Sequence, residues 1–115
     1  MNGYTETHTS QLIDLTKIER VDVVGMSEID LPDPDRAERW DDVLRYHRWD
    51  VMVAMDDGKL ITYLRGARCQ SEDNPCFTKA DREMSEDERD TMNQVAAELR
   101  QDIHAAKRLK EESSD

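Results

Sequence analysis

The chain has 115 residues and a formal net charge of -11 at pH 7, with 27 acidic residues against 16 basic ones. This length suits one domain with a single modest core, to which Leu, Ile, Val and Phe contribute only 21 residues. The charge excludes a broad basic face, which supplies most of the affinity of nucleic-acid-binding proteins, so we expect no direct binding of nucleic acid. We expect one acidic domain over residues 1–115 whose ends, 1–11 and 111–115, are polar and mobile.

The acidity favours a particular kind of partner. Acidic proteins associate faster with basic proteins through long-range steering, which added salt weakens, so we expect a basic protein partner. General solubility or adaptation to high salt explains the same charge. No window approaches the roughly 18 apolar residues of a membrane span, and the polar N-terminus lacks a signal-peptide pattern. We therefore expect a cytoplasmic protein without a membrane partner.

The most specific local pattern lies at residues 48–68, where two apolar stretches flank Asp57-Gly58. Asp-Gly is typical of a type I′ turn, in which both central residues have positive φ, so the sequence predicts a β-hairpin. In the register set by this turn, the facing pairs are Met55–Leu60, Val53–Thr62, Val51–Leu64, Ala54–Ile61, Met52–Tyr63 and Asp50–Arg65. At the end far from the turn we expect a positive spot, formed by Arg45, Arg48, Arg65 and Arg68.

Further elements are predicted on either side of the hairpin. The β-branched residues at 18–26 predict a third strand after a short irregular or helical lead-in. Asp33 and Pro34 suit the cap and first turn of a short helix that ends near Tyr46. Residues 69–79 read as a polar loop.

A long helix is predicted in the C-terminal third. Thr78 and Ser85 are each followed three residues later by an acid, and Ser85 with Glu88 makes the fuller capping box. A buried stripe at the 3.5-residue spacing follows, formed by Met92, Ala96, Leu99, Ile103 and Ala106. Together the patterns predict an α+β fold: a small three-stranded antiparallel sheet, with the hairpin at its centre, packed by a short helix and a long C-terminal helix.

Residues that carry catalytic or metal chemistry are few and scattered. The histidines are His8, His47 and His104, and the two cysteines, Cys69 and Cys76, lie in the polar loop. None has the spacing of a two-ligand zinc motif, and no nucleophile elbow or phosphate loop is present. We therefore predict no metal, no cofactor and no enzyme activity. We expect reduced cysteines because the chain lacks an export signal, with a disulfide as the alternative.

The remaining feature is the density of carboxylates. Residues 28–57 hold ten acids against four arginines, and residues 72–90 hold eight against three basic residues. Carboxylates spaced along helices imitate a row of phosphates electrostatically. The acids expected to bind the partner are Glu38, Asp41, Asp42, Asp56, Asp57, Glu83, Glu86, Asp87 and Asp90; a solvated polar face is the simpler reading of any single run.

These patterns predict a non-enzymatic interaction module that inhibits a nucleic-acid-binding complex by masking its basic surface. In size, acidity and lack of a catalytic motif, the chain resembles phage anti-restriction DNA mimics and some anti-CRISPR proteins, which share no motif that maps onto residues here. One alternative is a structural or regulatory homodimer paired through the long helix, so a monomer and a homodimer both remain open. Another is a small metal or thiol enzyme that uses Cys69, Cys76 and a histidine.

Overall fold

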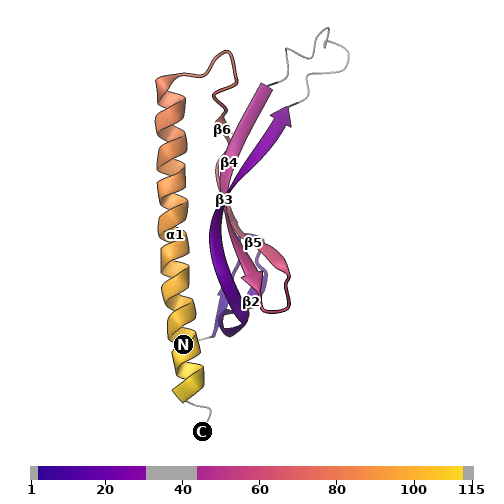
Figure 1. Cartoon of the computed structure of the whole chain (residues 1–115), viewed down its shortest axis with the longest axis vertical. Coiled ribbons are helices and arrows are strands. Elements are labelled where there is room, and N and C mark those ends of the chain that lie inside the picture. The colour runs from indigo at the N-terminus through magenta and orange to yellow at the C-terminus, as the bar shows by residue number, and fades with distance from the viewer. Residues whose placement is uncertain (1–2, 31–43, 113–115) are drawn as a thin grey trace.

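A computed structural model describes residues 3–30 and 44–112 of the chain. Its elements, in chain order, are β1 (Tyr4–Glu6), β2 (Leu12–Asp14), the 3₁₀ turn η1 (Leu15–Lys17), β3 (Ile18–Asp30), β4 (Leu44–Met55), β5 (Leu60–Arg65), β6 (Cys69–Gln70) and α1 (Lys79–Glu112). In the antiparallel main sheet, β4 is central, with β3 along one side and β5 followed by β6 along the other. The long helix α1 runs beside this sheet (Figure 1). The predicted α+β class is confirmed, but the sheet has four strands rather than three.

The N-terminal segment forms a second, two-stranded sheet from β1 and β2, where the sequence predicts no strand. Thr7 is buried at its turn, where its hydroxyl accepts a hydrogen bond from the N–H of Gln11 (3.1 Å). The N–H of His8 donates to the carbonyl of Tyr63 on β5 (2.9 Å). These polar contacts hold the segment together with Ile13 of β2, which is buried in the hydrophobic core, and apolar periodicity does not reveal the polar contacts.

The lead-in to β3 is the short turn η1, capped by Asp14. The Asp14 carboxylate accepts hydrogen bonds from the hydroxyl (2.7 Å) and the N–H (2.9 Å) of Thr16. These bonds, above all the one from the hydroxyl, hold the pKa of the carboxyl below its usual range. The helical form of the predicted lead-in is therefore confirmed for three residues.

The strands β3 and β4 are both longer than the sequence predicts. The predicted strand at 18–26 continues to Asp30, and β4 begins at Leu44. Residues 44–46, predicted as the end of the short helix, are therefore strand, since pairing such as Glu28 with Tyr46 overrides the helical spacing of the side chains. The rest of that predicted helix, including Glu38, Asp41 and Asp42, lies outside the described residues.

The predicted hairpin is confirmed, but its turn type and part of its register are wrong. Gly58 has φ +88°, and Asp57 does not have positive φ. The N–H of Gly58 donates to the carbonyl of Met55 (3.0 Å), and the N–H of Met55 donates to the carbonyl of Lys59 (2.8 Å). This is a three-residue loop closed by a left-handed glycine, the next most common hairpin connection after the two-residue turns.

The longer loop moves the register by one residue. The pairs nearest the turn are Ala54–Leu60, Val53–Ile61 and Met52–Thr62 in place of the predicted ones. An irregularity at Tyr63 then restores the predicted pairs Val51–Leu64 and Asp50–Arg65. A bulge puts two residues of one strand opposite one residue of its partner. The extra residue of β5 at Tyr63 therefore compensates for the extra residue in the turn.

The predicted buried stripe on α1 is confirmed. Its side chains pack against η1, β3 and β4; Leu99 is 2% exposed, and Val51 and Val53 are fully buried. Because this stripe covers the sheet of its own chain, a homodimer through it would require α1 to leave its core. We call η1, β5 and α1 from residue 92 onward, with the parts of β3 and β4 beside them, the core half of the molecule.

The opposite end, which we call the polar half, contains β6, residues 71–74 and α1 up to residue 91. Here the helix begins at Lys79 because Thr78 and Asp81 form a reciprocal cap: the N–H of Thr78 donates to Asp81 (2.8 Å), and the N–H of Asp81 donates to the Thr78 hydroxyl (3.2 Å). The predicted cap at Ser85 is therefore wrong, since Ser85 lies inside the helix. At the other end, α1 continues to Glu112, into the predicted tail.

Candidate functional site

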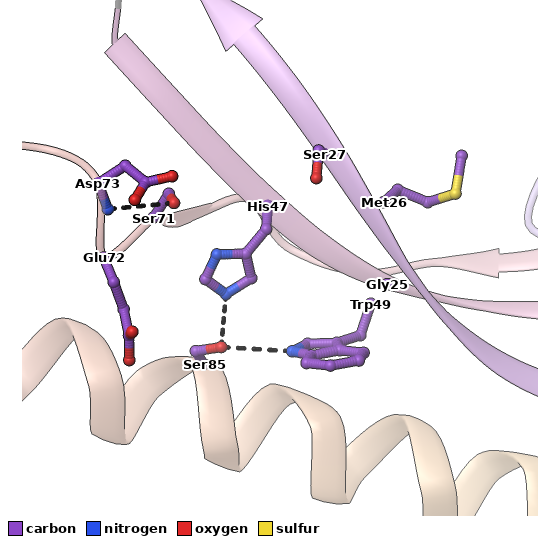
Figure 2. Close-up of a pocket in the computed structure, with 9 residues that line it drawn as sticks. All are labelled: Gly25, Met26, Ser27, His47, Trp49, Ser71, Glu72, Asp73 and Ser85. Atoms are coloured by element: carbon purple, nitrogen blue, oxygen red, sulfur yellow. Dashed lines mark hydrogen bonds between the residues drawn. The ribbon is translucent and has the colours of Figure 1, made fainter.

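Ser85 joins the helix to the sheet in the polar half. Its hydroxyl oxygen lies 2.5 Å from Nε2 of His47 and 3.3 Å from Nε1 of Trp49, two side chains on the same face of β4 (Figure 2). The indole N–H of tryptophan only donates, so the Ser85 oxygen accepts from Trp49. The serine hydrogen is then available for His47. These bonds act as a clamp between α1 and β4.

A serine beside a histidine also raises the question of nucleophilic catalysis. Such pairs need a third group that orients the histidine, together with donors for an oxyanion. Among the described residues, Nδ1 of His47 has no hydrogen-bond partner, and the oxygen of Ser85 is already engaged by Trp49. The backbone around Ser85 is part of a continuous helix, whose N–H groups bond within it. The geometry therefore favours the structural role.

A pocket of about 450 Å³ opens beside this clamp. It is lined by Gly25, Met26 and Ser27 of β3, by His47 and Trp49 of β4, by Ser71, Glu72 and Asp73, and by Ser85. Gly25 lies close to the Trp49 ring at its wall: a Cβ there would lie 3.2 Å from the ring, which would have to shift by a few tenths of an ångström to accept it. Two carboxylates line this pocket, and each already has an arginine partner: Glu72 pairs with Arg82 (3.2 Å) and Asp73 with Arg45 (3.6 Å).

The turn that carries Glu72 and Asp73 is fixed by Asn74. This buried side chain accepts from the N–H of Arg45 (2.6 Å) and donates its amide N–H to the carbonyl of the same residue. Beyond the end of β6, the Asn74 amide thus makes the hydrogen bonds to the Arg45 backbone that a residue of a paired strand would make. A polar loop is predicted here, but only the packing shows that its asparagine continues the ladder.

Opposite the helix-facing side of β4, Asp50 is buried although it is charged. Its carboxylate accepts two hydrogen bonds from Nε of Arg48, each 3.1 Å, and one from the N–H of Gly66 (3.2 Å). A Cβ at Gly66 would lie 2.1 Å from the carbonyl oxygen of Trp49, so the chain passes β4 too closely for any other residue. Asp50 thereby supplies a hydrogen-bond acceptor for the N–H of Gly66, in the segment between β5 and β6 where strand pairing with β4 is interrupted.

Three of the four arginines predicted to form a positive spot at this end of the hairpin are paired with acids. Arg48 pairs with Glu28 as well as with Asp50, Arg68 pairs with Glu28 (3.1 Å) and Asp30 (3.4 Å), and Arg45 pairs with Asp73 (3.6 Å). The guanidinium of Arg68 also lies 3.9 Å from the ring centre of Tyr46. The sequence placed these arginines together at one end of the hairpin, but it did not identify the acids of β3, Glu28 and Asp30, with which two of them pair.

Four of the acids predicted to bind the partner lie together on the outer side of α1. Glu83, Glu86, Asp87 and Asp90 are all exposed, and we call them the α1 acidic stripe. Their spacing of three, four and seven residues places them on one face of a helix, and that face points away from the buried stripe. Within the described part of the chain, only Glu83 has an ion-pair partner, Lys79 at 3.9 Å.

The other described acids of the prediction lie elsewhere. Asp56 and Asp57 are exposed at the hairpin turn, where the N–H of Asp56 donates to the carbonyl of Lys17 (2.8 Å). Lys107 reaches the neighbouring carbonyl of Ile18 (2.8 Å), so the turn lies beside the C-terminal part of α1. A helix rises about 1.5 Å per residue, which puts the turn about 30 Å from the α1 acidic stripe. The structure does not bring the two groups together.

The cysteines and histidines do not converge either. Cys69 is buried on β6 and Cys76 is exposed, and both are free thiols. Burial raises the pKa of the Cys69 thiol, and the charges of Glu88 and Asp81 raise it further, so this thiol stays protonated and unreactive. Among residues 3–30 and 44–112, no three His, Cys, Asp or Glu side chains form a group that could hold a metal ion.

Comparison with protein-family models, with curated proteins and with solved structures finds no significant match. The chain therefore has to be interpreted from its own residues. Its long helix α1 is too polar to cross a membrane, and the described residues contain no other helix that could do so.

Proposed function

We propose that this protein is a non-enzymatic, cytoplasmic interaction module that binds and masks the basic nucleic-acid-binding surface of a partner protein. The observation that supports the proposal best is the α1 acidic stripe. Its four carboxylates follow one face of a straight helix, and three of them, Glu86, Asp87 and Asp90, are without an ion-pair partner among the described residues. Their charge is therefore available to a partner.

The distribution of charge pairs supports the same choice. Around β3 and β4, carboxylates such as Glu28, Asp30 and Asp50 are used to hold the molecule's own arginines. The stripe lies on the opposite side of the helix from the core, so its acids contribute little to packing. Residues 79–90 hold six acids against three basic residues, whereas residues 91–112 hold four of each. The excess negative charge of α1 is concentrated in its polar half.

The mode of inhibition follows from electrostatics. Positive grooves that bind nucleic acid attract a row of negative charges, and such complexes form quickly and weaken as salt screens the charges. A rigid helix holds its carboxylates in place before binding, which limits the entropy lost on association. Bound in such a groove, α1 would exclude nucleic acid from it. Inhibition of a host defence complex is the form of this activity that the composition favours.

A matched pair of charge reversals tests the proposal. The tagged protein is used to capture partners from a host lysate at low and at high salt, and the bound protein is challenged with short duplex DNA. We expect capture of a nucleic-acid-binding protein that duplex DNA releases. Glu86→Lys with Asp90→Lys should weaken capture by at least tenfold, about 1.4 kcal/mol, since two negative charges on the proposed contact face become positive.

The control carries Glu98→Lys and Asp102→Lys, two exposed acids of the same helix at the same spacing of four residues. It changes the net charge equally but lies toward the C-terminal end of α1, so it should retain most of the binding. Equal losses in the two variants would reduce the effect to net charge alone. Capture that withstands both the stripe variant and duplex DNA would overturn the proposed function.

A further inference from the structure

One face of the main sheet has no covering layer among the described residues. The side chains of Val21, Val51 and Val53 point to α1 and belong to the hydrophobic core. Because successive side chains of a strand point to opposite faces, the residues between them point away from the helix. Within the described chain, α1 is the helix that packs on this sheet, and it lies along one side of it (Figure 1). We call the opposite side the outer sheet face.

The centre of the outer sheet face is apolar. It is formed by Val24 and Met26 of β3, Met52 and Ala54 of β4, and Leu60 and Thr62 of β5, whose positions follow from the register of the strands. Leu60 is 64% exposed, Met26 38% and Val24 37%, and none of the six belongs to the core or packs against it. Asp50 lies among them but is only 1% exposed, so its charge hardly reaches the surface. Apolar side chains that gather on an exposed face mark a site of interaction.

The charges on this face cancel. Four arginines and four acids share it, namely Arg20, Arg48, Arg65, Arg68, Asp22, Glu28, Asp30 and Asp50. Seven of these eight pair with one another, from Arg20 with Asp22 (2.6 Å) to Arg68 with Asp30 (3.4 Å). In the described part of the chain only Arg65 lacks an ion-pair partner, and on β5, at the rim of the sheet, its long side chain keeps its charge in water. The face is therefore neutral in a chain with a net charge of -11.

This neutrality limits what can bind to the outer sheet face. A basic protein finds no unpaired carboxylate there, and nucleic acid finds a single arginine without a partner. The face fits a surface that is apolar at its centre and neutral around it, because charges buried at an interface are costly unless they are already paired. A second copy of the chain presents that surface, and two-fold dimers, in which one patch meets itself, are the commonest oligomers.

The distribution of residues along the strands sets the orientation of the two copies. Met52, Ala54 and Leu60 lie in the core half, whereas Glu28 and its arginine partners lie toward the polar half. A two-fold axis parallel to β4 places apolar side chains over apolar ones and paired charges over paired charges. An axis across the strands would instead bury ion pairs under apolar side chains, which is costly. The favoured axis also keeps the two sheets aligned, as in a β-sandwich.

The acidity of the chain does not prevent this arrangement. In each copy α1 lies on the far side of its sheet. Packed sheets lie about 10 Å apart, and each helix adds about 10 Å, so the two helices are separated by about 30 Å. Salt screens charges over about 8 Å at physiological ionic strength. The two α1 acidic stripes therefore repel each other weakly.

The size of the face predicts the strength of the association. The 12 residues of β4 extend over about 40 Å, and three strands are about 14 Å wide, which gives a footprint on the order of 550 Å² in each copy. This area lies near the lower limit of specific interfaces, where complexes are weak. We therefore expect association that depends on concentration in the micromolar range or above.

We propose that two copies of this chain pack face to face through the outer sheet face, forming a symmetric dimer in which the two α1 acidic stripes point away from each other. The dimer leaves α1 in its own core, unlike a dimer paired through the buried stripe of that helix. The outer sheet face is separate from the α1 acidic stripe, and the inference does not depend on the function proposed for that stripe.

The first test is the mass of the full chain in solution. Sedimentation equilibrium from micromolar to millimolar concentration, at low and at high salt, should show a mass that rises from 13.4 kDa toward twice that value. High salt should strengthen the dimer because it screens the like net charges of the two copies. A constant mass of 13.4 kDa at both salt concentrations would overturn the proposal. Capture through the α1 acidic stripe weakens with salt, so the two proposals fail independently.

Methionine methyl groups locate the interface without any substitution. Met26 and Met52 lie on the outer sheet face, whereas Met84 is exposed on α1 and Met92 is buried beneath it. We expect the NMR signals of the Met26 and Met52 methyl groups to shift as the concentration rises and those of Met84 and Met92 to stay constant. Shifts at Met84 alone would place the contact on the helix and overturn the outer sheet face as the interface.

A matched pair of leucine variants completes the test. Leu60 and Leu12 are 64% and 69% exposed, and Leu12 lies on β2, outside the main sheet. Both Leu60→Lys and Leu12→Lys lower the net negative charge by one, which by itself lessens repulsion. Leu60→Lys should nevertheless weaken the dimer by about tenfold or more, since two ammonium groups without partners enter the symmetric interface. Leu12→Lys should associate like the native chain.

Equal association of the two variants would contradict the proposed interface. If Leu60→Lys does not fold, the methionine signals of the native chain still decide. The Glu86→Lys, Asp90→Lys protein should dimerise at least as well as the native chain, because its substitutions lie on the far side of α1.

Discussion

The two halves of the molecule are held together by different forces. In the core half, aliphatic side chains of α1 pack on η1, β3 and β4 with almost no exposed surface. In the polar half, the same helix and strand are joined by the Ser85 clamp, and Arg48 of β4 is paired with Glu28 of β3. One half is thus stabilised by apolar burial, and the other is held together by polar contacts.

This difference has a thermodynamic consequence. Apolar burial provides most of the favourable free energy of folding, whereas hydrogen bonds and exposed ion pairs contribute little net stability. Regions with few buried apolar contacts open at lower free energy than the core. We therefore expect the core half to determine global stability and the polar half to open first, with Asp50 as the exception because it is buried and charged.

The largest effect is expected for Asp50→Ala, at the junction of the halves. This variant leaves the buried Arg48 with only Glu28 and leaves the N–H of Gly66 without its acceptor, and breaking a buried pair in this way costs about 3–5 kcal/mol. Urea denaturation measures the loss. A loss below about 1 kcal/mol, the usual limit for surface pairs, would show that Asp50 behaves as a surface charge.

Leu99→Ala probes the core half directly. Removing a fully buried leucine side chain costs about 2–5 kcal/mol, depending on how far the cavity closes. The matched control is Leu109→Ala on the same helix, because Leu109 is 50% exposed and should cost far less. Similar losses in the two variants, measured by the same denaturation, would break the assignment of global stability to this half.

Ser85→Ala probes the polar half. It removes the hydroxyl that contacts His47 and Trp49, and we expect a loss of about 1 kcal/mol or less, since the net value of a hydrogen bond is near that figure. Hydrogen exchange should instead show faster opening in the first turns of α1, with exchange around Leu99 unchanged. Uniform acceleration along the whole helix would mean that the two halves unfold as one unit.

The smallest perturbation is chemical labelling of the thiols. Cys76 is exposed, whereas Cys69 is buried with a raised pKa, so a thiol reagent at neutral pH should modify Cys76 at once and Cys69 only after β6 detaches. Mass spectrometry of the modified peptides distinguishes them, with Cys76→Ser as the control. Rapid labelling of Cys69 in the native protein would show that the polar half is open at equilibrium.

The features that the sequence predicted correctly are those that depend on interactions between residues close together in the chain. The buried stripe of α1 and the existence of the hairpin rest on patterns within one segment, and both are confirmed. The predicted cap at Ser85 failed because Thr78 and Asp81 supply a cap about two turns earlier, and Ser85 bonds to β4 instead. The turn type failed because Asp-Gly is compatible with both two- and three-residue loops.

The candidate sites show the same limit. Carboxylate density correctly located Glu83, Glu86, Asp87 and Asp90 on an exposed face, since helical spacing alone places them there. It also named Asp56 and Asp57, which lie at the hairpin turn beside the C-terminal part of α1, so their part in binding stays a prediction. The contact of His47 with Ser85 joins residues 38 positions apart. The buried position of Asp50 likewise depends on a distant residue, Gly66, whose N–H it accepts. The apolar run that follows Asp50 in β4 was the one local signal available for its burial.

By itself, the sequence determined the composition of this protein, its long amphipathic helix, its hairpin and the acids along the outer face of that helix, because each depends on neighbouring residues and a fixed period. Only the tertiary structure decided where the charges are paired and how α1 meets the edge of β3. Those features depend on how the sheet twists relative to α1, which brings Arg100 and Lys107 onto the carbonyls of Val21 and Ile18.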